Sequence, residues 1–475
     1  MIILEEIDFL VIGSGPAGQK GAIQASKSGR KVTVIEGYET GGSSLWTGTI
    51  PSKALREAIL DLTNFTQKSF YAEHHKLPKT HEISISDLNF RVNWVKRHLK
   101  ETITKQLQKN GIEVLPGVAR FIDAHTVVVS SNGKEDRKFS AKTILLATGS
   151  KPRCSKKIPF DGKRVFNSSS LLDMDNIPKS MIVIGAGVIG TEYASMFCVL
   201  GTKVTLVDKG ARILSHLDKE IGDHLQVCLE RSNLIFMGGK EYQKIQVNEK
   251  GVEVVFSDGT SVSAETVLVA AGREANVDSL EINHAGLSLN QKGYLDVNEQ
   301  YQTKIEHIFA AGDIIDGSCL SSTAYVEGRL AGLNACGEKG SQFQNLYPYG
   351  IYTIPEISSI GKTEEELVAD GIDYEVGRAY YYEISKCVIT GAESGLCKII
   401  FNPKTFEVLG AHIIGLGATE SIHLAQVAIS FNLKMDYFVE HVFNFPTFAE
   451  MYRISALNGM NKCKKGSKNG DLQHF

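Results

Sequence analysis

The chain has 475 residues, which is too long for one hydrophobic core and predicts about two to four domains. Its residues are 43% hydrophobic and 22% charged, and the formal net charge is −3, so neither a nucleic acid nor an anionic membrane is an expected partner. No apolar run reaches the about 18 residues of a transmembrane helix, and acids stand near the N-terminus where a secretory signal has bases.

The first predicted element is an apolar strand that leads through a glycine-rich turn into a helix. Residues 8–36 read DFLVIGSGPAGQKGAIQASKSGRKVTVIE, and the pattern returns at 180–208 as SMIVIGAGVIGTEYASMFCVLGTKVTLVD. Each copy is a strand, a GxGxxG turn, a helix and a second strand that ends in an acid, which are the parts of a dinucleotide-binding unit. The turn glycines are Gly13, Gly15 and Gly18, then Gly185, Gly187 and Gly190, and the terminal acids are Glu36 and Asp208. The repeat predicts two dinucleotide sites.

Three segments outside the repeat carry further signals. Residues 41–55, GGSSLWTGTIPSKAL, form a glycine-rich loop that enters a helix and carries hydroxyl groups at Ser44 and Thr49. Residues 143–150, TILLATGS, predict a strand that ends in a turn of small residues, which suits a backbone passing close to a cofactor. The strand within 303–314 ends in Gly312-Asp313, whose acid either bonds to a polyol chain or caps a helix, and these two roles are compatible.

Taken together, the motifs resemble the pyridine nucleotide–disulfide oxidoreductase family of flavoproteins from Asp8 to about Asn458. The shared segments are, in order, GSGPAG, PSKAL, ATGS, GAGVIG, AAGRE, AAGD and IYTIPEISSIG. The resemblance implies an α/β fold with two Rossmann-like dinucleotide-binding domains and a C-terminal α+β dimerisation domain. It also implies one FAD per subunit and a homodimer or higher homo-oligomer. The implied FAD contacts are Gly13, Gly15, Gly18, Glu36, Lys53, Gly149, Gly312 and Asp313, and the implied nicotinamide nucleotide contacts are Gly185, Gly187, Gly190 and Asp208.

The expected domain limits follow from the placement of the motifs. We expect an FAD-binding domain over 1–150 that resumes at 275–345, an NAD(P)-binding domain over 151–274, a dimerisation domain over 346–462 and a flexible tail over 463–475. The tail expectation rests on the polar, lysine-containing composition after Met460. Residues 65–110 mix charged and apolar residues in a way that suits long helices.

Two motifs depart from the family pattern. The disulfide reductases of this family carry a Cys-x4-Cys pair in the loop, and the aligned positions here are Ser44 and Thr49. The family's C-terminal His-Pro-Thr-x-x-Glu supplies a histidine base, and the aligned position here is Phe445. A disulfide cycle and a proton shuttle are therefore not expected at these positions. His441, four residues upstream, is interpreted as a surface or packing histidine.

With both nucleotide motifs intact, electrons are expected to reach the flavin and to leave by the side on which they arrive. The sequence predicts ping-pong hydride transfer between NADPH and NAD, and the TIPSKALR and IYTIPEISS segments resemble the transhydrogenase subgroup of the family. One rival is an NAD(P)H dehydrogenase or diaphorase that reduces quinone or oxygen. A second is a non-catalytic flavoprotein that senses NADH, and a disulfide reductase is a distant third.

Single residues are given roles by the same resemblance. Lys53 and Glu192 are implied to pair near flavin N5, where the lysine charge stabilises the reduced ring; the alternative is a solvated lysine and an ordinary first-turn glutamate. Tyr193 either gates the nicotinamide pocket or packs in the core. Ser44, Thr49 and Phe445 are expected to fill the far face of the flavin and to keep it dry.

The choice between the two nicotinamide nucleotides depends on the end of the second repeat. Asp208 suits the ribose 2′-hydroxyl of NAD and repels the 2′-phosphate of NADP. Lys209 and Arg212 follow it and either supply a counter-charge or form a solvated loop. Dual use with a bias toward NAD is the resulting expectation.

The number and spacing of the cysteines indicate whether the protein is expected in a reducing or an oxidising compartment. Eight are scattered along the chain without a CxxC pair, so we expect them to be buried small hydrophobic residues. No group of metal ligands stands out in the sequence. A reducing cytoplasm fits this pattern best.

Overall fold

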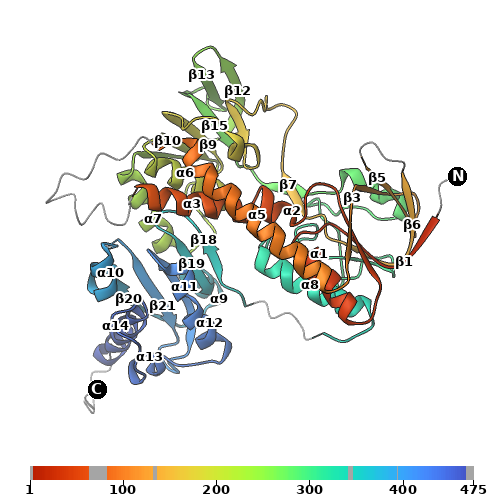
Figure 1. Ribbon diagram of the computed structural model, residues 1–475. Coiled ribbons are helices and arrows are strands. Elements are labelled where there is room, and N and C mark those ends of the chain that lie inside the picture. Colours follow the sequence, from red (N-terminus) through yellow and green to blue (C-terminus); the bar gives the residue numbers. More distant parts are fainter. Residues whose placement is uncertain (1–3, 64–82, 132–135, 341–345, 393, 467–475) are drawn as a thin grey trace.

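The computed structural model describes residues 4–63, 83–131, 136–340, 346–392 and 394–466. These residues form three units: an N-terminal α/β unit, a second α/β unit inserted into it, and a C-terminal α+β unit (Figure 1). No helix among the described residues has both the length and the apolar character needed to span a bilayer.

The first unit is built on a parallel sheet. Its strands are β3 (Glu113–Pro116), β2 (Val32–Glu36), β1 (Leu4–Ile12), β6 (Arg137–Leu146) and β17 (Ile308–Ala310), in that order. The antiparallel strands β5 (Thr126–Ser130) and β4 (Val118–Phe121) extend the sheet along the first half of β6. Phe9 and Val11 of β1 enter one buried cluster, and Leu10 and Ile12 enter another. The sheet is therefore covered on both faces, as a parallel sheet requires.

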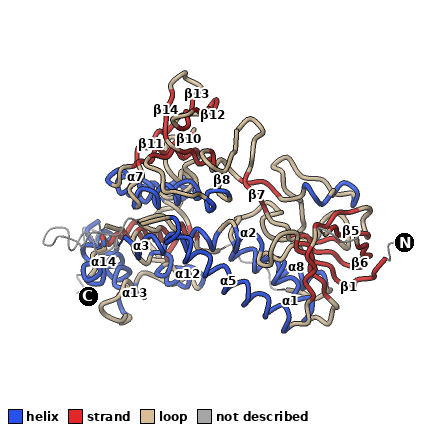
Figure 2. The backbone as a smooth tube through the Cα atoms, turned by 45° about the horizontal axis from the view of Figure 1, so that its top comes forward, coloured by secondary structure: helices blue, strands red, loops and turns tan. Residues whose placement is uncertain are grey.

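Helices α1 (Pro16–Lys27) and α8 (Ser321–Ala335) lie side by side on one face of this sheet (Figures 1 and 2). Glycine at the crossing allows the close approach, since a Cβ atom on Gly328 would lie 2.0 Å from the carbonyl oxygen of Ala17. Because α8 follows β17 near the C-terminal end of the chain's first unit, this packing brings a late segment beside the first glycine turn.

Three helices follow β2: α2 (Gly42–Trp46), α3 (Thr49–Thr63) and the long α5 (Ile85–Lys109). Residues of α3 and α5 share a buried cluster with the inserted unit. Ser84 and Asp87 form a capping box that fixes the start of α5. The prediction of long helices over 65–110 is confirmed for 85–109, and the remainder of that stretch up to residue 82 lies outside the described residues.

The inserted unit repeats the plan of the first. Its parallel sheet runs β11 (Leu234–Gly238), β10 (Lys203–Asp208), β9 (Ser180–Ile184), β15 (Thr266–Val269) and β8 (Val165–Asn167). Helix α6 (Val188–Val199) follows β9, and α7 (Lys219–Arg231) precedes β11. Strands β12 (Tyr242–Asn248), β13 (Gly251–Phe256) and β14 (Ser261–Ala264) form an antiparallel sheet that projects from this unit (Figure 2).

The two passages between the α/β units run side by side. Strand β7 (Ser150–Pro152) leaves the first unit, and β16 (Arg273–Ala275) returns to it in antiparallel pairing. The domain limits expected near 150 and 274 fall within this pair.

Short 3₁₀ turns lie at Ser170–Asp173, Asp278–Leu280, Ile282–Ala285 and Tyr381–Glu383.

The C-terminal unit is an antiparallel sheet with helices on it. The strand order is β18 (Tyr349–Ile351), β19 (Ile357–Gly361), β22 (Val408–Ile414), β21 (Leu396–Phe401) and β20 (Glu375–Tyr380). The helices are α9 (Glu364–Asp370), α10 (Ser385–Thr390), α11 (Ala418–Ser421), α12 (His423–Ser430), α13 (Asp436–Glu440) and α14 (Glu450–Gly466).

The expected start of a flexible tail at residue 463 is wrong, because α14 continues to Gly466. Lys462 donates a hydrogen bond from Nζ to the carbonyl oxygen of Val376 at 2.6 Å, and Cys463 packs against the core of this unit. Polar composition pointed to disorder, but contacts with β20 hold the last helical turns in place. Residues 467–475 lie outside the described residues.

Candidate active site

One cavity of about 940 Å³ is lined by residues from all three units. The first unit contributes the glycine turn after β1, helices α2 and α3, the ends of β6 and β17, and the start of α8. The inserted unit contributes the first turn of α6, and the C-terminal unit contributes β18 and the loop that follows it. Its size suits a large organic cofactor.

The first glycine turn has the geometry of a phosphate cradle. Gly13 has a φ of 103°, which favours glycine, and a Cβ on Gly18 would lie 1.9 Å from the carbonyl oxygen of Gly13. Gly15 is the N-cap residue of α1, and a Cβ built on it meets no atom within 4 Å. The backbone at Gly15 therefore borders open space at the positive end of a helix, where a pyrophosphate binds well.

Glu36 at the end of β2 closes the first turn. Its Oε2 accepts hydrogen bonds from the backbone N–H of Ser14 at 2.8 Å and from the Ser14 hydroxyl at 2.6 Å, and its Oε1 accepts from the N–H of Tyr38 at 2.9 Å. A carboxylate has about four acceptor positions, so one remains for a ribose hydroxyl at the cavity wall.

The second glycine turn has the same construction. Gly185 has a φ of 107°, a Cβ on Gly190 would lie 1.8 Å from the Gly185 carbonyl oxygen, and one on Gly187 meets nothing within 4 Å. Asp208 accepts hydrogen bonds from the N–H groups of Ala186 at 2.7 Å and Gly210 at 2.6 Å. Among the described residues, Gly185, Ala186 and Gly187 do not line the cavity, and the part of this segment that does begins at Val188.

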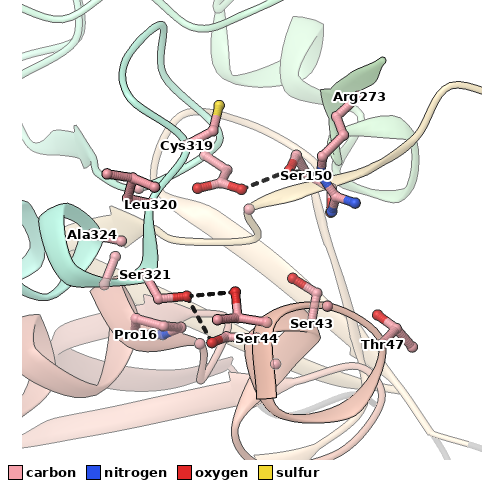
Figure 3. Close-up of a pocket in the computed structure, with 18 of the residues that line it drawn as sticks. Pro16, Ser43, Ser44, Thr47, Ser150, Arg273, Cys319, Leu320, Ser321 and Ala324 are labelled. Carbon is pink, nitrogen blue, oxygen red and sulfur yellow. Dashed lines mark hydrogen bonds between the residues drawn. The ribbon is translucent and has the colours of Figure 1, made fainter. Parts of the chain in front are cut away.

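Asp313 also lines the cavity and belongs to a chain of polar contacts. Its Oδ2 accepts a hydrogen bond from the Ser150 hydroxyl at 2.8 Å, and Arg273 donates to that hydroxyl at 2.9 Å and to the Ser150 carbonyl oxygen at 2.7 Å (Figure 3). Gly149, with a φ of 68°, precedes Ser150. Arg273 is part of the AAGRE segment, but no sequence pattern predicted its contact with Ser150 in the first unit.

Gly312 is also fixed by a polar contact. Its N–H donates to Oε2 of Glu327 at 2.9 Å, and burial raises the pKa of that glutamate despite this hydrogen bond. A Cβ on Gly312 would lie 3.0 Å from the Cβ of Ala17 on α1. The turn after β17 is thus pressed against the helix of the first glycine turn.

Lys53 and Glu192 meet inside the cavity and join two units. Lys53 Nζ lies 2.6 Å from Glu192 Oε2, and the side chains are 24% and 4% exposed. The C-terminal unit completes the group, because the N–H of Tyr352 donates to Glu192 Oε1 at 2.8 Å and the Tyr352 ring centroid lies 4.9 Å from Lys53 Nζ. The lysine is therefore held by an ion pair and a cation–π contact rather than solvated.

The two hydroxyl positions of the loop are joined through a third. Ser44 Oγ lies 2.8 Å from Ser321 Oγ, and Thr49 Oγ1 lies 3.1 Å from the same atom (Figure 3). Ser321 is the first residue of α8 and had no sequence signal, because a serine at a helix start is common.

Within one chain, the residues of the C-terminal motif around Phe445 lie away from the cavity. The Phe445 side chain is 71% exposed and is not among the described residues that line the cavity. Glu450 accepts a hydrogen bond from the N–H of Ser385 at 3.2 Å. The interpretation of His441 as a surface residue is confirmed: it is exposed and stacks on Tyr437 with ring centroids 4.3 Å apart.

The structure also shows the surroundings of Tyr193 and of the two basic residues that follow Asp208. Tyr193 borders the cavity but is 3% exposed, and burial raises the pKa of its hydroxyl. Lys209 is exposed. Arg212 lies 3.8 Å from Asp223, and its buried Nε and Nη2 atoms have no hydrogen-bond partner among the described residues.

All eight cysteines are free, but the expectation that they are buried is wrong for two. Cys154 and Cys319 are exposed, whereas Cys198, Cys387 and Cys397 are buried. Cys319 lines the cavity, where desolvation and the nearby Asp313 carboxylate raise the pKa of its thiol to about 11, so the thiol is protonated at neutral pH. No group of three or more metal-ligating side chains occurs within the described part of the chain.

Comparison with known proteins identifies the class. Residues 7–328 match the family model of the pyridine nucleotide-disulphide oxidoreductases, and residues 347–456 match the dimerisation domain of the same family. The chain belongs to the pyridine nucleotide-disulphide oxidoreductase family, with the mixed α/β architecture and C-terminal dimerisation domain that the sequence predicted.

Within this family, the chain is similar in sequence to a group of curated relatives that share one name. A soluble pyridine nucleotide transhydrogenase of Mycobacterium tuberculosis is 39% identical over 463 residues, covering 97% of this chain and 98% of the relative. Proteins of the same name from Marinomonas sp. and Photobacterium profundum are 39% and 38% identical, each over 96% of this chain and over 98% and 97% of the relative. The resemblance to the transhydrogenase subgroup is thus confirmed at the level of sequence.

Solved structures agree on the fold. LpdA from Mycobacterium tuberculosis has a TM-score of 0.86 and 25% identity, covering 95% of this chain and 99% of that one. The HOCl-induced flavoprotein disulfide reductase RclA from Escherichia coli has a TM-score of 0.83 at 24% identity, covering 96% and 99%. At that identity RclA supports the fold alone.

Proposed function

We propose that this protein is an FAD-dependent soluble pyridine nucleotide transhydrogenase that moves hydride between NADPH and NAD by a ping-pong route. The relatives of that name support the activity, and the two glycine turns support two dinucleotides. The proposal rests on Ser44 and Thr49, which contact Ser321 at the cavity wall and occupy the two loop positions that we align with the cysteines of the disulfide reductases.

The residues at the cavity fit FAD. The open space at Gly15 suits the pyrophosphate, the free acceptor position of Glu36 suits a ribose hydroxyl, and Asp313 with Gly149 and Gly312 suits the polyol chain. FAD, when bound, accepts a hydride from one nicotinamide nucleotide and passes it to another. We assign one FAD to each subunit.

Within this site the chain's own residues hold charge and exclude water. Lys53, fixed by Glu192 and Tyr352, places a positive charge at the cavity wall where it favours negative charge on the ring. Tyr193 borders the same space from the NAD(P) side and gates it in our proposal. Ser44 and Thr49 have no sulfur that could accept two electrons from the reduced flavin. The two electrons therefore leave as a hydride to a second nucleotide.

The C-terminal unit fits a homodimer. Phe431, Val442 and Phe445 are 73%, 95% and 71% exposed in the region that matches the dimerisation domain. Because they lie in the region that matches the dimerisation domain, we propose these exposed apolar side chains as contacts between subunits. We propose a homodimer or a higher homo-oligomer in the cytoplasm, with NAD(H) and NADP(H) as the small-molecule partners and with neither nucleic acid nor membrane bound.

Asp208 is proposed to set the nucleotide preference, with Gly185, Gly187 and Gly190 forming the cradle. Replacing Asp208 with asparagine is expected to raise kcat/KM for NADPH and lower it for NADH, each by about 10- to 100-fold, because one charged contact is worth about 1.5–3 kcal/mol. Steady-state kinetics with all four nucleotides measure both changes. Asp175→Asn, an exposed aspartate in the same unit, is the control and should leave the ratio unchanged. A variant with the wild-type ratio would contradict the assignment.

The activity itself is tested anaerobically with NADPH as donor and thio-NAD as acceptor. The proposal predicts thio-NADH formation with parallel double-reciprocal lines. Rapid quinone reduction with little thio-NADH would instead support an NAD(P)H dehydrogenase or diaphorase. Slow reoxidation by every small acceptor would support a non-catalytic sensor of NADH.

A further inference from the structure

Three hydroxyl groups from distant parts of the chain meet at the cavity wall. Ser44 lies on α2, Thr49 is the first residue of α3, and Ser321 is the first residue of α8. Ser321 Oγ is the centre of the group, at 2.8 Å from Ser44 Oγ and 3.1 Å from Thr49 Oγ1 (Figure 3). All three residues line the cavity. We call these three residues the hydroxyl cluster.

An ordinary helix-capping role does not account for Ser321. The N-cap residue of α8 is Leu320, and the helix has no side-chain cap hydrogen bond. The hydroxyl of Ser321 instead points to the loop that carries Ser44 and Thr49. It thereby connects α2 to α3, and both to α8, without a covalent bond.

The hydroxyl cluster has one more O–H proton than its internal hydrogen bonds use. Each hydroxyl has one proton, and two hydrogen bonds within the cluster use two of the three. One O–H therefore stays free in every arrangement of donors and acceptors. Because the cluster lines the cavity, this O–H is available to a group bound there.

We propose that Ser321 is a positioning residue for the flavin: it fixes the loop from Gly42 to Thr49 against α8 and lets the hydroxyl cluster donate one hydrogen bond to the bound ring. The inference rests on the FAD part of the proposed function. A hydrogen bond from the cluster strengthens as the ring gains negative charge on reduction, so the cluster shifts the redox equilibrium toward the reduced ring.

The test compares Ser321→Ala with Ser321→Thr in the FAD-loaded protein. Two properties are measured: the two-electron midpoint potential of the flavin and the hydrogen exchange of backbone amides in 42–52. In Ser321→Ala we expect a redox equilibrium shifted about tenfold toward oxidised flavin, equal to about 30 mV for this couple, and faster exchange. Ser321→Thr keeps the hydroxyl and should restore both.

Thr102→Ala is the control. Thr102 is an exposed residue of α5 and is not among the described residues that line the cavity, so both properties should stay at the wild-type value. A Ser321→Ala protein with wild-type potential and exchange would overturn the inference. If Ser321→Ala releases FAD and Ser321→Thr retains it, the hydroxyl is confirmed as the positioning group; release by both would overturn it. Because neither readout depends on the electron acceptor, a failed transhydrogenase assay would leave this result standing.

Discussion

Replacing Lys53 with methionine is expected to lower the rate of flavin reduction by NADPH about 10²–10³-fold, the loss typical for removal of one preorganised charged or hydrogen-bonding group. Glu192, 4% exposed, would keep the Tyr352 N–H as donor but lose its cation. The rate is measured in a single turnover by anaerobic stopped-flow absorbance of the flavin.

A double variant separates two causes of that loss. If Lys53 acts on the flavin, Lys53→Met/Glu192→Gln should remain slow; if the loss comes from an unpaired Glu192, the double variant should recover. Lys53→Arg should retain much of the rate, and Lys105→Met, at an exposed lysine of α5, should retain all of it. Wild-type reduction by Lys53→Met would contradict the assignment of Lys53.

Replacing Lys398 with methionine is expected to destabilise the protein by about 3–5 kcal/mol, because it leaves the buried carboxylate of Asp218 without its cation. Lys398 is 1% exposed, and its Nζ lies 2.8 Å from both oxygens of Asp218, which is 0% exposed. Glu220 and Glu364 also contact Nζ, so the group joins α7 of the NAD(P) unit to the C-terminal sheet. Denaturant unfolding measures the loss.

Two variants show whether burial is the cause. Lys404→Met, which removes a lysine 79% exposed and 3.0 Å from Asp373, should change stability by less than about 1 kcal/mol. Lys398→Met/Asp218→Asn should recover part of the loss, because it removes the unpaired charge. Equal losses from Lys398→Met and Lys404→Met would contradict the account.

The stabilisation by Lys398 should depend on pH in a defined direction. Burial acts to raise the pKa of Asp218, but the charges of His412 and Lys398 outweigh it and hold that pKa below its usual range. A lowered carboxyl pKa gives stability that is present above the unfolded value, about 4, and is lost as pH falls through the folded value. The pKa of Lys398 is raised by its carboxylates against the effect of burial, so its contribution is lost only as pH rises past about 10. The difference between wild type and Lys398→Met should therefore be largest between these limits.

The sequence predicted those parts of the site that are encoded by local pattern. The glycine turns at Gly13 and Gly185 were found because only glycine fits their backbone, and the acids Glu36 and Asp208 because each ends a strand. The pairing of Lys53 with Glu192 came from family resemblance, and the structure places the two side chains in contact.

What the sequence missed depends on contacts between distant segments. Tyr352 contacts Glu192 through a backbone N–H, which no side-chain pattern reveals, and Ser321 bonds to a loop near the start of the chain. The last turns of α14 were taken for a tail because their composition is polar, although Lys462 and Cys463 contact the C-terminal unit.

In the proposed site, the flavin is the acceptor of one electron pair, and the loop positions that we align with the reductases' cysteines hold Ser44 and Thr49. Anaerobic titration of the FAD-loaded protein with dithionite measures this capacity. We expect full reduction by one electron pair per FAD, without a long-wavelength thiolate–flavin charge-transfer band. Uptake of a second pair per FAD, with such a band at the midpoint, would contradict it.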